Sequence, residues 1–155
     1  MTDDRTQIVE TIYCYATGID SRDWPLYRSI FTDEIDVDFS SYDGIPPRRV
    51  RADDWVKGVQ PLFEGLDATQ HTMTNPRVRI EGDRATCVMY MQAAHFLHNK
   101  QGDAEFTLGG YYTDELVKTS SGWKLCGVRL TVLWSRGNRA IMGMAVGPRG
   151  HSPRS

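Results

Sequence analysis

The first segment of the chain places apolar residues at the spacing of an α-helix that begins at Asp3 or Asp4 and ends near Ile19. One stripe along this helix consists of Val9, Tyr13, Ala16 and Asp20, and Ile12 and Ile19 widen it. Asp20 therefore puts a carboxylate where the pattern favours an apolar side chain. Burying an unpaired carboxylate costs several kcal/mol, so we expect the fold to give Asp20 a partner or to keep it protonated. The alternative role for Asp20 is to cap the helix that follows.

The segments up to about residue 65 predict a short helix, a strand and a longer helix. The short helix starts near Ser21 or Asp23, and the run EIDVDFSSY, residues 34–42, alternates like a half-buried strand. GIPPRR is typical of a turn. Asp53 is the expected N-cap of the helix DWVKGVQPLF, which Pro61 should kink. The apolar face of that helix consists of Trp55, Val59, Leu62 and Phe63.

From Gln70 onward, long apolar or alternating runs are separated by turn residues, which indicates an antiparallel sheet. EGDR is the clearest hairpin turn, and the glycine pair in TLGGYYT marks a bulge or a close backbone approach. The last run is expected to place on one face Cys126, Val128, Leu130, Val132 and Trp134. Helices followed by such strands predict an α+β, cone-shaped fold, with N-terminal helices packed on a strongly curved, mostly antiparallel sheet. This domain is expected to span residues 1–146, followed by a flexible tail, residues 147–155.

The composition narrows the possible functional classes. The 155 residues are 40% hydrophobic and 25% charged, with a formal net charge of -2, as in an ordinary globular domain. This balance gives no basic face for nucleic acid, and no apolar run reaches the ~20 residues that a membrane span needs. The start of the chain lacks a signal-peptide pattern, so a cytoplasmic location is expected. Cys14, Cys87 and Cys126 lack metal-ligand spacing and are expected to be reduced thiols.

Two histidines are candidate partners for Asp20. His71 opens the first long run, in TQHTMTN, and His95 lies in QAAHFLH of its expected hairpin partner. If positions 80 and 85 pair across the EGDR turn, His71 pairs with Ala94 and points to the face opposite His95, but one β-bulge reverses this. The pattern leaves both alternatives open. His95 and His98 are three residues apart on one strand and should point opposite ways, so no metal site is expected there.

Five segments carry a family resemblance over nearly the whole chain. In order they are YATGIDSRDW, TQHTMTN, YMQAAHF, GGYYTDELV and SGWKLCGVRLTVLW. Together they resemble the SnoaL-like family of the nuclear transport factor 2-like superfamily. Scytalone dehydratase, bile acid dehydratase, hexachlorocyclohexane dehydrochlorinase and the polyketide cyclases are similar proteins, and the resemblance implies the same cone of helices wrapped by a curved sheet.

The resemblance also implies roles for individual residues. It makes His71 the general base and Asp20 the carboxylate that holds it, so that Asp20 faces a cavity and accepts a hydrogen bond from His71. A carboxylate on one ring nitrogen fixes the tautomer and makes the other nitrogen the better base. Tyr15 is implied as a catalytic pocket tyrosine, and His95 as a residue that binds water or the leaving group.

Phe39 and Tyr112 are further expected substrate-binding residues, and both depart from scytalone dehydratase. Phe39 stands where that enzyme has a pocket tyrosine. Gly110 and Tyr112 align with the serine and asparagine that help to bind its substrate. These departures argue against scytalone itself as the substrate. The identity of the proton donor is left open among Tyr15, Tyr42 and Tyr112.

The sequence therefore predicts a cofactor-independent acid–base enzyme, a dehydratase or another elimination lyase, acting on a small, mostly apolar, cyclic molecule. One alternative is an isomerase or polyketide cyclase in which Asp20 itself takes the proton. Another is a non-catalytic ligand-binding or structural subunit, such as the small subunit of a ring-hydroxylating dioxygenase. No metal, other cofactor, nucleic acid or membrane partner is expected. The resemblance also implies a homo-oligomer, a dimer or trimer formed through the outer face of the sheet.

Overall fold

The computed structural model describes residues 2–147 and contains both helices and strands. The helices are α1 (Asp4–Asp20), α2 (Trp24–Ser29), α3 (Ser40–Asp43), α4 (Ala52–Gly65) and α5 (Ala140–Val146). The strands are β1 (Phe31–Asp38), β2 (Arg48–Arg51), β3 (Ala68–Glu81), β4 (Arg84–Phe96), β5 (Glu105–Thr119) and β6 (Gly122–Gly137). The predicted flexible tail, apart from Gly147, lies outside the described residues.

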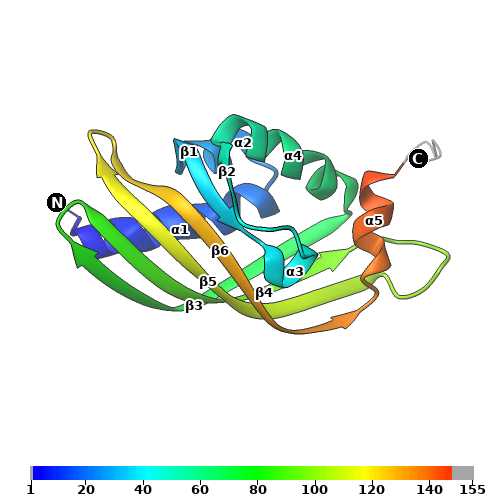
Figure 1. The fold of residues 1–155 in the computed structure, drawn as a ribbon. Coiled ribbons are helices and arrows are strands. Elements are labelled where there is room, and N and C mark those ends of the chain that lie inside the picture. The colour runs from blue at the N-terminus through cyan, green and yellow to red at the C-terminus, as the bar shows by residue number, and fades with distance from the viewer. Residues whose placement is uncertain (1, 148–155) are drawn as a thin grey trace.

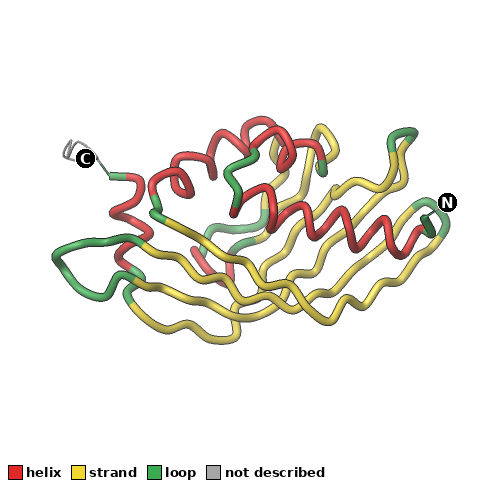
Figure 2. The backbone as a smooth tube through the Cα atoms, turned by 180° about the vertical axis from the view of Figure 1, so that it is seen from behind, coloured by secondary structure: helices red, strands yellow, loops and turns green. Residues whose placement is uncertain are grey.

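The strands form one curved sheet in the order β2-β1-β6-β5-β4-β3. Figure 1 shows the sheet as a trough, with α1, α2 and α4 over its hollow side and α5 at the end far from the N-terminus. Figure 2 shows the same layers from behind. β1 pairs with β6 in parallel, and the other neighbouring strands are antiparallel. The architecture confirms the predicted α+β class and the mostly antiparallel, curved sheet.

Two aspartates cap the first two helices. The Thr6 N–H donates to Asp3 Oδ1 over 2.9 Å, and the Leu26 N–H donates to Asp23 Oδ1 over 2.9 Å. Each bond satisfies a backbone donor that a helix N-terminus leaves without an intrahelical partner. Because Asp23 caps α2, Asp20 does not have the capping role that the sequence left open.

The buried face of α1 differs from the stripe read from the sequence. Tyr13 belongs to that stripe but is 36% exposed. The buried face is made by Ile8, Ile12, Tyr15, Ala16 and Ile19, with Gly18 between them. The predicted stripe is therefore wrong at Tyr13, because two overlapping apolar stripes have similar spacing in this helix. Asp20 lies at the margin of the buried face, with a side chain that is 22% exposed.

Three local features between residues 44 and 147 depart from the prediction. Asp53 is not the N-cap of α4: Arg51 occupies that position, and Asp53 in the first turn pairs with Arg28 instead. The predicted turn GIPPRR ends in the edge strand β2, which pairs with β1. Helix α5 was not indicated by the pattern. It packs on α4 so closely that a Cβ on Gly65 would lie 2.0 Å from the Ala145 carbonyl oxygen.

The glycine pair of β5 marks both a bulge and a close approach, as predicted. The register between β5 and β6 shifts between Gly109 and Gly110, and the backbone carbonyl of Thr131 leaves no room for a Cβ on Gly110. A second shift in this pair lies opposite Cys126. The two shifts break the alternation expected from Cys126 to Trp134, because each bulge adds a residue to one strand. Trp134 is 40% exposed, whereas the buried members of that run are Val128 and Leu130.

Candidate active site

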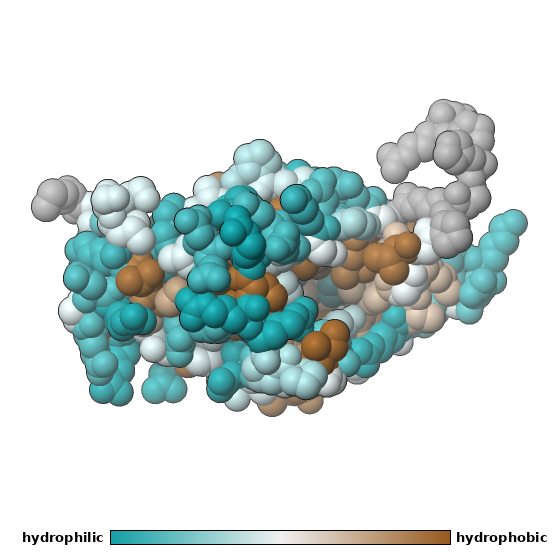
Figure 3. Space-filling view, turned by 45° about the horizontal axis from the view of Figure 1, so that its top comes forward, coloured by the Kyte–Doolittle hydropathy of each residue, from teal (hydrophilic) through white to brown (hydrophobic). Residues whose placement is uncertain are grey.

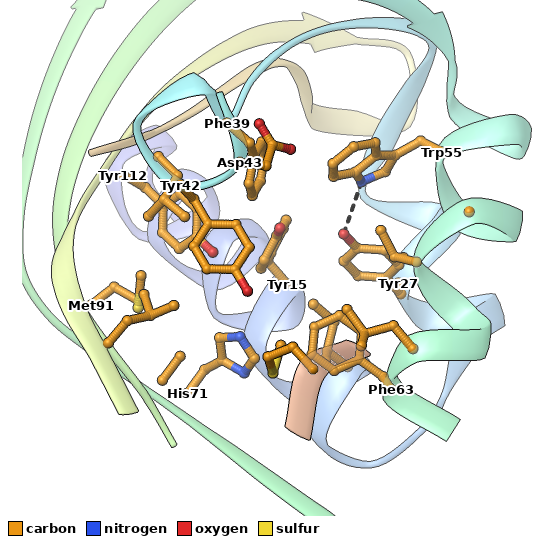
Figure 4. A pocket seen from close by; sticks show the side chains of 18 of the residues that line it. Tyr15, Tyr27, Phe39, Tyr42, Asp43, Trp55, Phe63, His71, Met91 and Tyr112 are labelled. Atoms are coloured by element: carbon orange, nitrogen blue, oxygen red, sulfur yellow. Dashed lines mark hydrogen bonds between the residues drawn. The ribbon is translucent and has the colours of Figure 1, made fainter. Parts of the chain in front are cut away.

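A cavity of about 470 Å³ lies between the hollow side of the sheet and the helices, each of which supplies a lining residue. Figure 4 shows Tyr15 of α1, Tyr42 of α3 and Trp55 of α4 around it. Its wall is mostly apolar, as in pockets for small organic molecules. The aromatic residues of the wall are Tyr15, Tyr27, Phe39, Tyr42, Trp55, Phe63 and Tyr112.

His71 and Asp20 form a hydrogen-bonded pair at this wall. His71 Nδ1 lies 2.7 Å from Asp20 Oδ1, and the His71 backbone N–H donates to Asp20 Oδ2 over 2.6 Å. A carboxylate can only accept, so Nδ1 carries the proton and Nε2 carries the lone pair of the neutral ring. His71 lines the cavity with a side chain that is 4% exposed, and Asp20 holds the ring from behind the wall.

Thr69 and Arg22 extend this pair into a network. The Thr69 hydroxyl donates to Asp20 Oδ1 over 3.0 Å, and the Arg22 guanidinium donates to Thr69 Oγ1 over 2.8 Å and to the Ile19 carbonyl over 2.7 Å. Burial opposes ionisation of Asp20, but the hydrogen bonds from His71 and Thr69 outweigh it, so the pKa of the Asp20 carboxyl is below its ordinary value. At neutral pH Asp20 is therefore a carboxylate.

A β-bulge in β3 brings His71 and His95 onto one face of the sheet. Positions 80 and 85 pair near the hairpin turn, but His71 pairs with Ala93 because the register shifts between residues 74 and 77. Asn75 and Pro76 stand opposite a single residue of β4, and Asn75 has a φ of 58°. Both histidines line the cavity, with ring centroids 6.0 Å apart. The bulge decides between the two alternatives that the sequence left open.

His95 is held as a neutral imidazole. It is 3% exposed, and its Nδ1–H donates to the Phe106 carbonyl over 3.0 Å. Burial, with the neighbouring His71 adding to it, lowers the pKa of His95 to about 4. At neutral pH its Nε2 therefore carries a lone pair, so the cavity-lining ring acts there as a hydrogen-bond acceptor and not as a proton donor.

The structure places Tyr15, Tyr112 and Phe39 in the cavity wall. The Tyr15 ring centroid lies 5.1 Å from that of Tyr27 and 5.3 Å from that of Tyr112. Burial raises the pKa of all three tyrosines, so their hydroxyls stay protonated and can donate. Trp55 Nε1–H donates to the Tyr27 hydroxyl over 3.0 Å, the bond drawn in Figure 4. The Phe39 and Trp55 ring centroids lie 5.1 Å apart.

Several residues at the site were missed by sequence reasoning. Trp55 was assigned only to the apolar face of its helix, and Tyr27 was given no role at the site, although both line the cavity. Met142 reaches the cavity from α5, a helix that the pattern did not indicate. Arg22 supports the pair by its hydrogen bond to Thr69, and its backbone has a φ of 58°. No neighbouring residue in the sequence predicts this left-handed conformation.

The cavity opens to solvent between α3, β2 and α4. The mouth consists of the lining residues that are exposed, namely Asp43, Arg48, Asp54 and Gly58. Figure 3 shows apolar side chains in a recess among hydrophilic residues on this side of the molecule. A ligand can thus enter from solvent without unfolding the sheet.

Residues 2–147 contain no group of three His, Cys, Asp or Glu side chains arranged to hold a metal ion. His98 lies outside the cavity, with Nδ1 3.3 Å from Asp67 Oδ2. The three cysteines are free thiols, and burial raises the pKa of Cys87 to about 11. Of the helices described, none combines the length and apolar character needed to cross a membrane.

Both the sequence and the fold of this chain are similar to those of known proteins. A SnoaL-like domain model matches residues 1–129. The structure of the Kfla4162 protein from Kribbella flavida is 32% identical, with a TM-score of 0.86 over 90% of this chain and 97% of that chain. A search of curated proteins finds no significant match.

Two further structures share the fold. A candidate aromatic ring hydroxylase from Novosphingobium aromaticivorans is 25% identical, with a TM-score of 0.77 over 90% of this chain and 96% of that chain. Hexachlorocyclohexane dehydrochlorinase LinA-type3 from Novosphingobium barchaimii is 18% identical, with a TM-score of 0.69 over 87% and 90%. Because the family model covers most of the sequence and the cone is shared along nearly its whole length, the chain belongs to the SnoaL-like family.

Proposed function

We propose that the protein is a cofactor-independent elimination lyase of the dehydratase type, acting on a small, mostly apolar, cyclic molecule. The observation that carries the proposal is the 2.7 Å contact between His71 Nδ1 and Asp20 Oδ1 at the wall of an apolar cavity. In such a pair the carboxylate orients the ring and stabilises the imidazolium that forms when Nε2 takes a proton. The shared fold with a hexachlorocyclohexane dehydrochlorinase supports the proposal of an elimination reaction.

The first step is removal of a proton from a carbon next to a carbonyl or another electron-withdrawing group. The C–H bond breaks, its proton goes to His71 Nε2, and its electron pair is delocalised as an enolate. Asp20, already ionised, lowers the energy of the resulting imidazolium. Hydrogen bonds from protonated tyrosines of the wall stabilise the enolate, with Tyr15, Tyr42 and Tyr112 as the donors within the cavity.

The second step expels the leaving group. The enolate pair forms the new C=C bond, the bond from carbon to the leaving oxygen breaks, and the departing hydroxide takes a proton to leave as water. His95 is neutral at pH 7 and accepts through Nε2, so it does not supply that proton. The donor is a wall tyrosine or the His71 imidazolium, and His95 accepts a hydrogen bond from the hydroxyl or water.

The proposal favours His71 over Asp20 as the base. In an isomerase or cyclase of the alternative type, the aspartate itself would face the reacting carbon. Asp20 instead sits behind the cavity wall, and its oxygens accept bonds from the His71 ring, the His71 backbone and Thr69. Its lone pairs are thus engaged in holding His71.

The test is turnover of cyclic β-hydroxy ketones with one to three rings, beginning with 3-hydroxy-1-tetralone, which loses water to give 1-naphthol. We expect His71→Ala to lower kcat/KM for the best member of the panel by about 100-fold or more, the usual contribution of a general base. The measurement is the absorbance of the unsaturated product. Unchanged turnover in His71→Ala would refute the proposed mechanism.

His98→Ala is the matched control. His98 is also paired with an aspartate, Asp67, but its side chain is 96% exposed and lies outside the cavity. We expect this variant to turn over the same substrate at the wild-type rate. An equal loss in both variants would assign the effect to folding and not to catalysis.

A non-catalytic subunit is the second candidate, favoured by the likeness to a candidate aromatic ring hydroxylase. The cavity of about 470 Å³ is not filled by protein side chains, which supports a ligand site in either case.

We further propose that the chain forms a homo-oligomer through the face of the sheet turned away from the helices. Tyr90, 55% exposed, and Trp134, 40% exposed, support this because large exposed aromatics mark interfaces.

A further inference from the structure

We infer that Gly58 is the residue that sets the size of the molecule admitted to the cavity, and that the admitted class is flat, fused-ring and apolar. The inference rests on the proposed function only in assuming that the cavity binds a small apolar molecule. The structural observation that supports it is that Gly58, which has no side chain, lies at the mouth of the cavity on helix α4.

Helix α4 turns two rows of residues toward the cavity, each with a spacing of four. The row nearer to solvent consists of Asp54, Gly58 and Leu62, and the row nearer to the core consists of Trp55, Val59 and Phe63. Residues four apart are neighbours on one face of a helix. Gly58 therefore leaves a gap in the outer row, between a charged residue and a leucine.

Neither the backbone conformation nor the packing of α4 requires glycine at position 58. Gly58 lies in the middle of α4 and is not among the glycines with positive φ, so its backbone does not need glycine. A Cβ on Gly58 would meet no heavy atom within 4 Å, so close packing does not need it either. Glycine inside a helix destabilises it relative to alanine. The remaining role is to leave space for something that is not part of the chain.

The surroundings of the gap indicate what passes through it. Phe39 and Trp55 form an aromatic pair beside it, with ring centroids 5.1 Å apart, and Tyr42 lines the cavity from α3. Flat aromatic faces favour flat rings stacked or edge-on against them. Figure 4 shows these rings around the space that leads to His71. A fused-ring molecule that slides past this pair uses the width that a side chain at position 58 would fill.

The test compares two neutral probes of the same chemistry and different width, 1-naphthol and 9-phenanthrol, by isothermal titration calorimetry. We expect Gly58→Leu to shift the ratio of the two dissociation constants at least about 10-fold in favour of 1-naphthol, the size of effect that a few methylenes produce in a pocket. Gly143→Leu is the matched control, because Gly143 is also an exposed helical glycine with nothing within 4 Å but does not line the cavity. It should leave the ratio unchanged.

An unchanged ratio in Gly58→Leu, or an equal change in Gly143→Leu, would overturn the inference, and so would a wild-type protein that binds neither probe. Thermal unfolding supplies the folding check. Gly58→Ala and Gly143→Ala should both raise Tm, since alanine favours a helix. A fall in Tm for Gly58→Ala alone would mean that α4 needs glycine for its own geometry and would contradict the inference. These binding readouts do not depend on turnover, so they separate this inference from the His71 mechanism.

Discussion

Asp114 is a carboxyl group in the core of the molecule, apart from the cavity wall. It is 2% exposed, and its Oδ1 has no hydrogen-bond partner among the residues that the structure describes. Burial raises the pKa of Asp114 well above its ordinary value, so folding favours the protonated form of this carboxyl. Such a group costs stability at neutral pH, because the unfolded chain would ionise it.

The sign of the pH dependence follows from that difference. Between the unfolded pKa of about 3.9 and the raised folded pKa, the native state binds one more proton, so stability falls by about 1.4 kcal/mol per pH unit from this residue. Asp114→Asn removes the ionisation and keeps the shape. We expect a higher Tm than wild type at pH 7 and a difference that shrinks toward pH 4, measured by circular dichroism. Identical pH profiles for the two proteins would contradict this assignment.

At the scale of single residues, the sequence predicted the pair of Asp20 and His71. It did not predict Arg22, which supports that pair through Thr69. Asp20 was conspicuous as a carboxylate in an apolar stripe, and family resemblance paired it with His71. The predicted stripe is wrong at Tyr13, which is 36% exposed, whereas Ala16 is buried as expected. Arg22 escaped notice because its role depends on a left-handed backbone that points its side chain back toward Thr69.

At the scale of elements, the bulge in β3 decides the chemistry of the cavity. Side chains alternate along a strand, so one extra residue moves every side chain beyond it to the other face. Without Asn75 and Pro76 opposite a single residue of β4, His71 and His95 would lie on opposite faces. The sequence supplied the hairpin turn and the strands, but it could not place a bulge within a long run.

The bulge is testable at Asn75, whose φ of 58° suits asparagine or glycine. We expect Asn75→Gly to fold with nearly wild-type stability. Asn75→Val should cost about 1 to 2 kcal/mol in the free energy of unfolding, because a β-branched side chain disfavours the left-handed region. Urea denaturation measures both. Equal stability of the two variants would mean that the bulge does not depend on this conformation.

The hydrophobic pattern could not predict β2, the pairing of β1 with β6, or α5, and each has a physical reason. Strand β2 is only four residues long, lies at the sheet edge and is mostly arginine, so it lacks an apolar period. The parallel pairing of β1 with β6 joins segments about 90 residues apart in sequence, which local spacing cannot reveal. Helix α5 is short and is stabilised by packing on α4 more than by its own propensity.

At the scale of the whole molecule, the outer face of the sheet carries the proposed oligomer contact. Tyr90 lies between Met89 and Met91, which point into the core, so its ring points away from the helices. We expect the wild type to have the mass of a dimer or trimer by light scattering. The double variant Tyr90→Glu and Trp134→Glu should have the mass of a monomer, because a carboxylate opposes burial in an apolar contact.

Ile45→Glu is the control, since Ile45 is a similarly exposed apolar residue, 45% exposed, in the α3–β2 connection and not on a strand. It should keep the wild-type mass. A monomeric wild type, or a double variant with unchanged mass, would exclude this face as the interface.

The position of Trp55 in the cavity wall has a practical consequence. The chain has four tryptophans, and Trp55 is the one whose indole lies in the cavity wall. Trp24 and Trp123 donate their N–H groups to the carboxylates of Glu64 and Asp4 elsewhere in the fold. A compound that fills the hollow changes the polarity around the Trp55 indole, so its ultraviolet emission should respond to occupancy. The molecule thus contains its own optical reporter, and a compound library can be screened for the natural ligand without any attached dye.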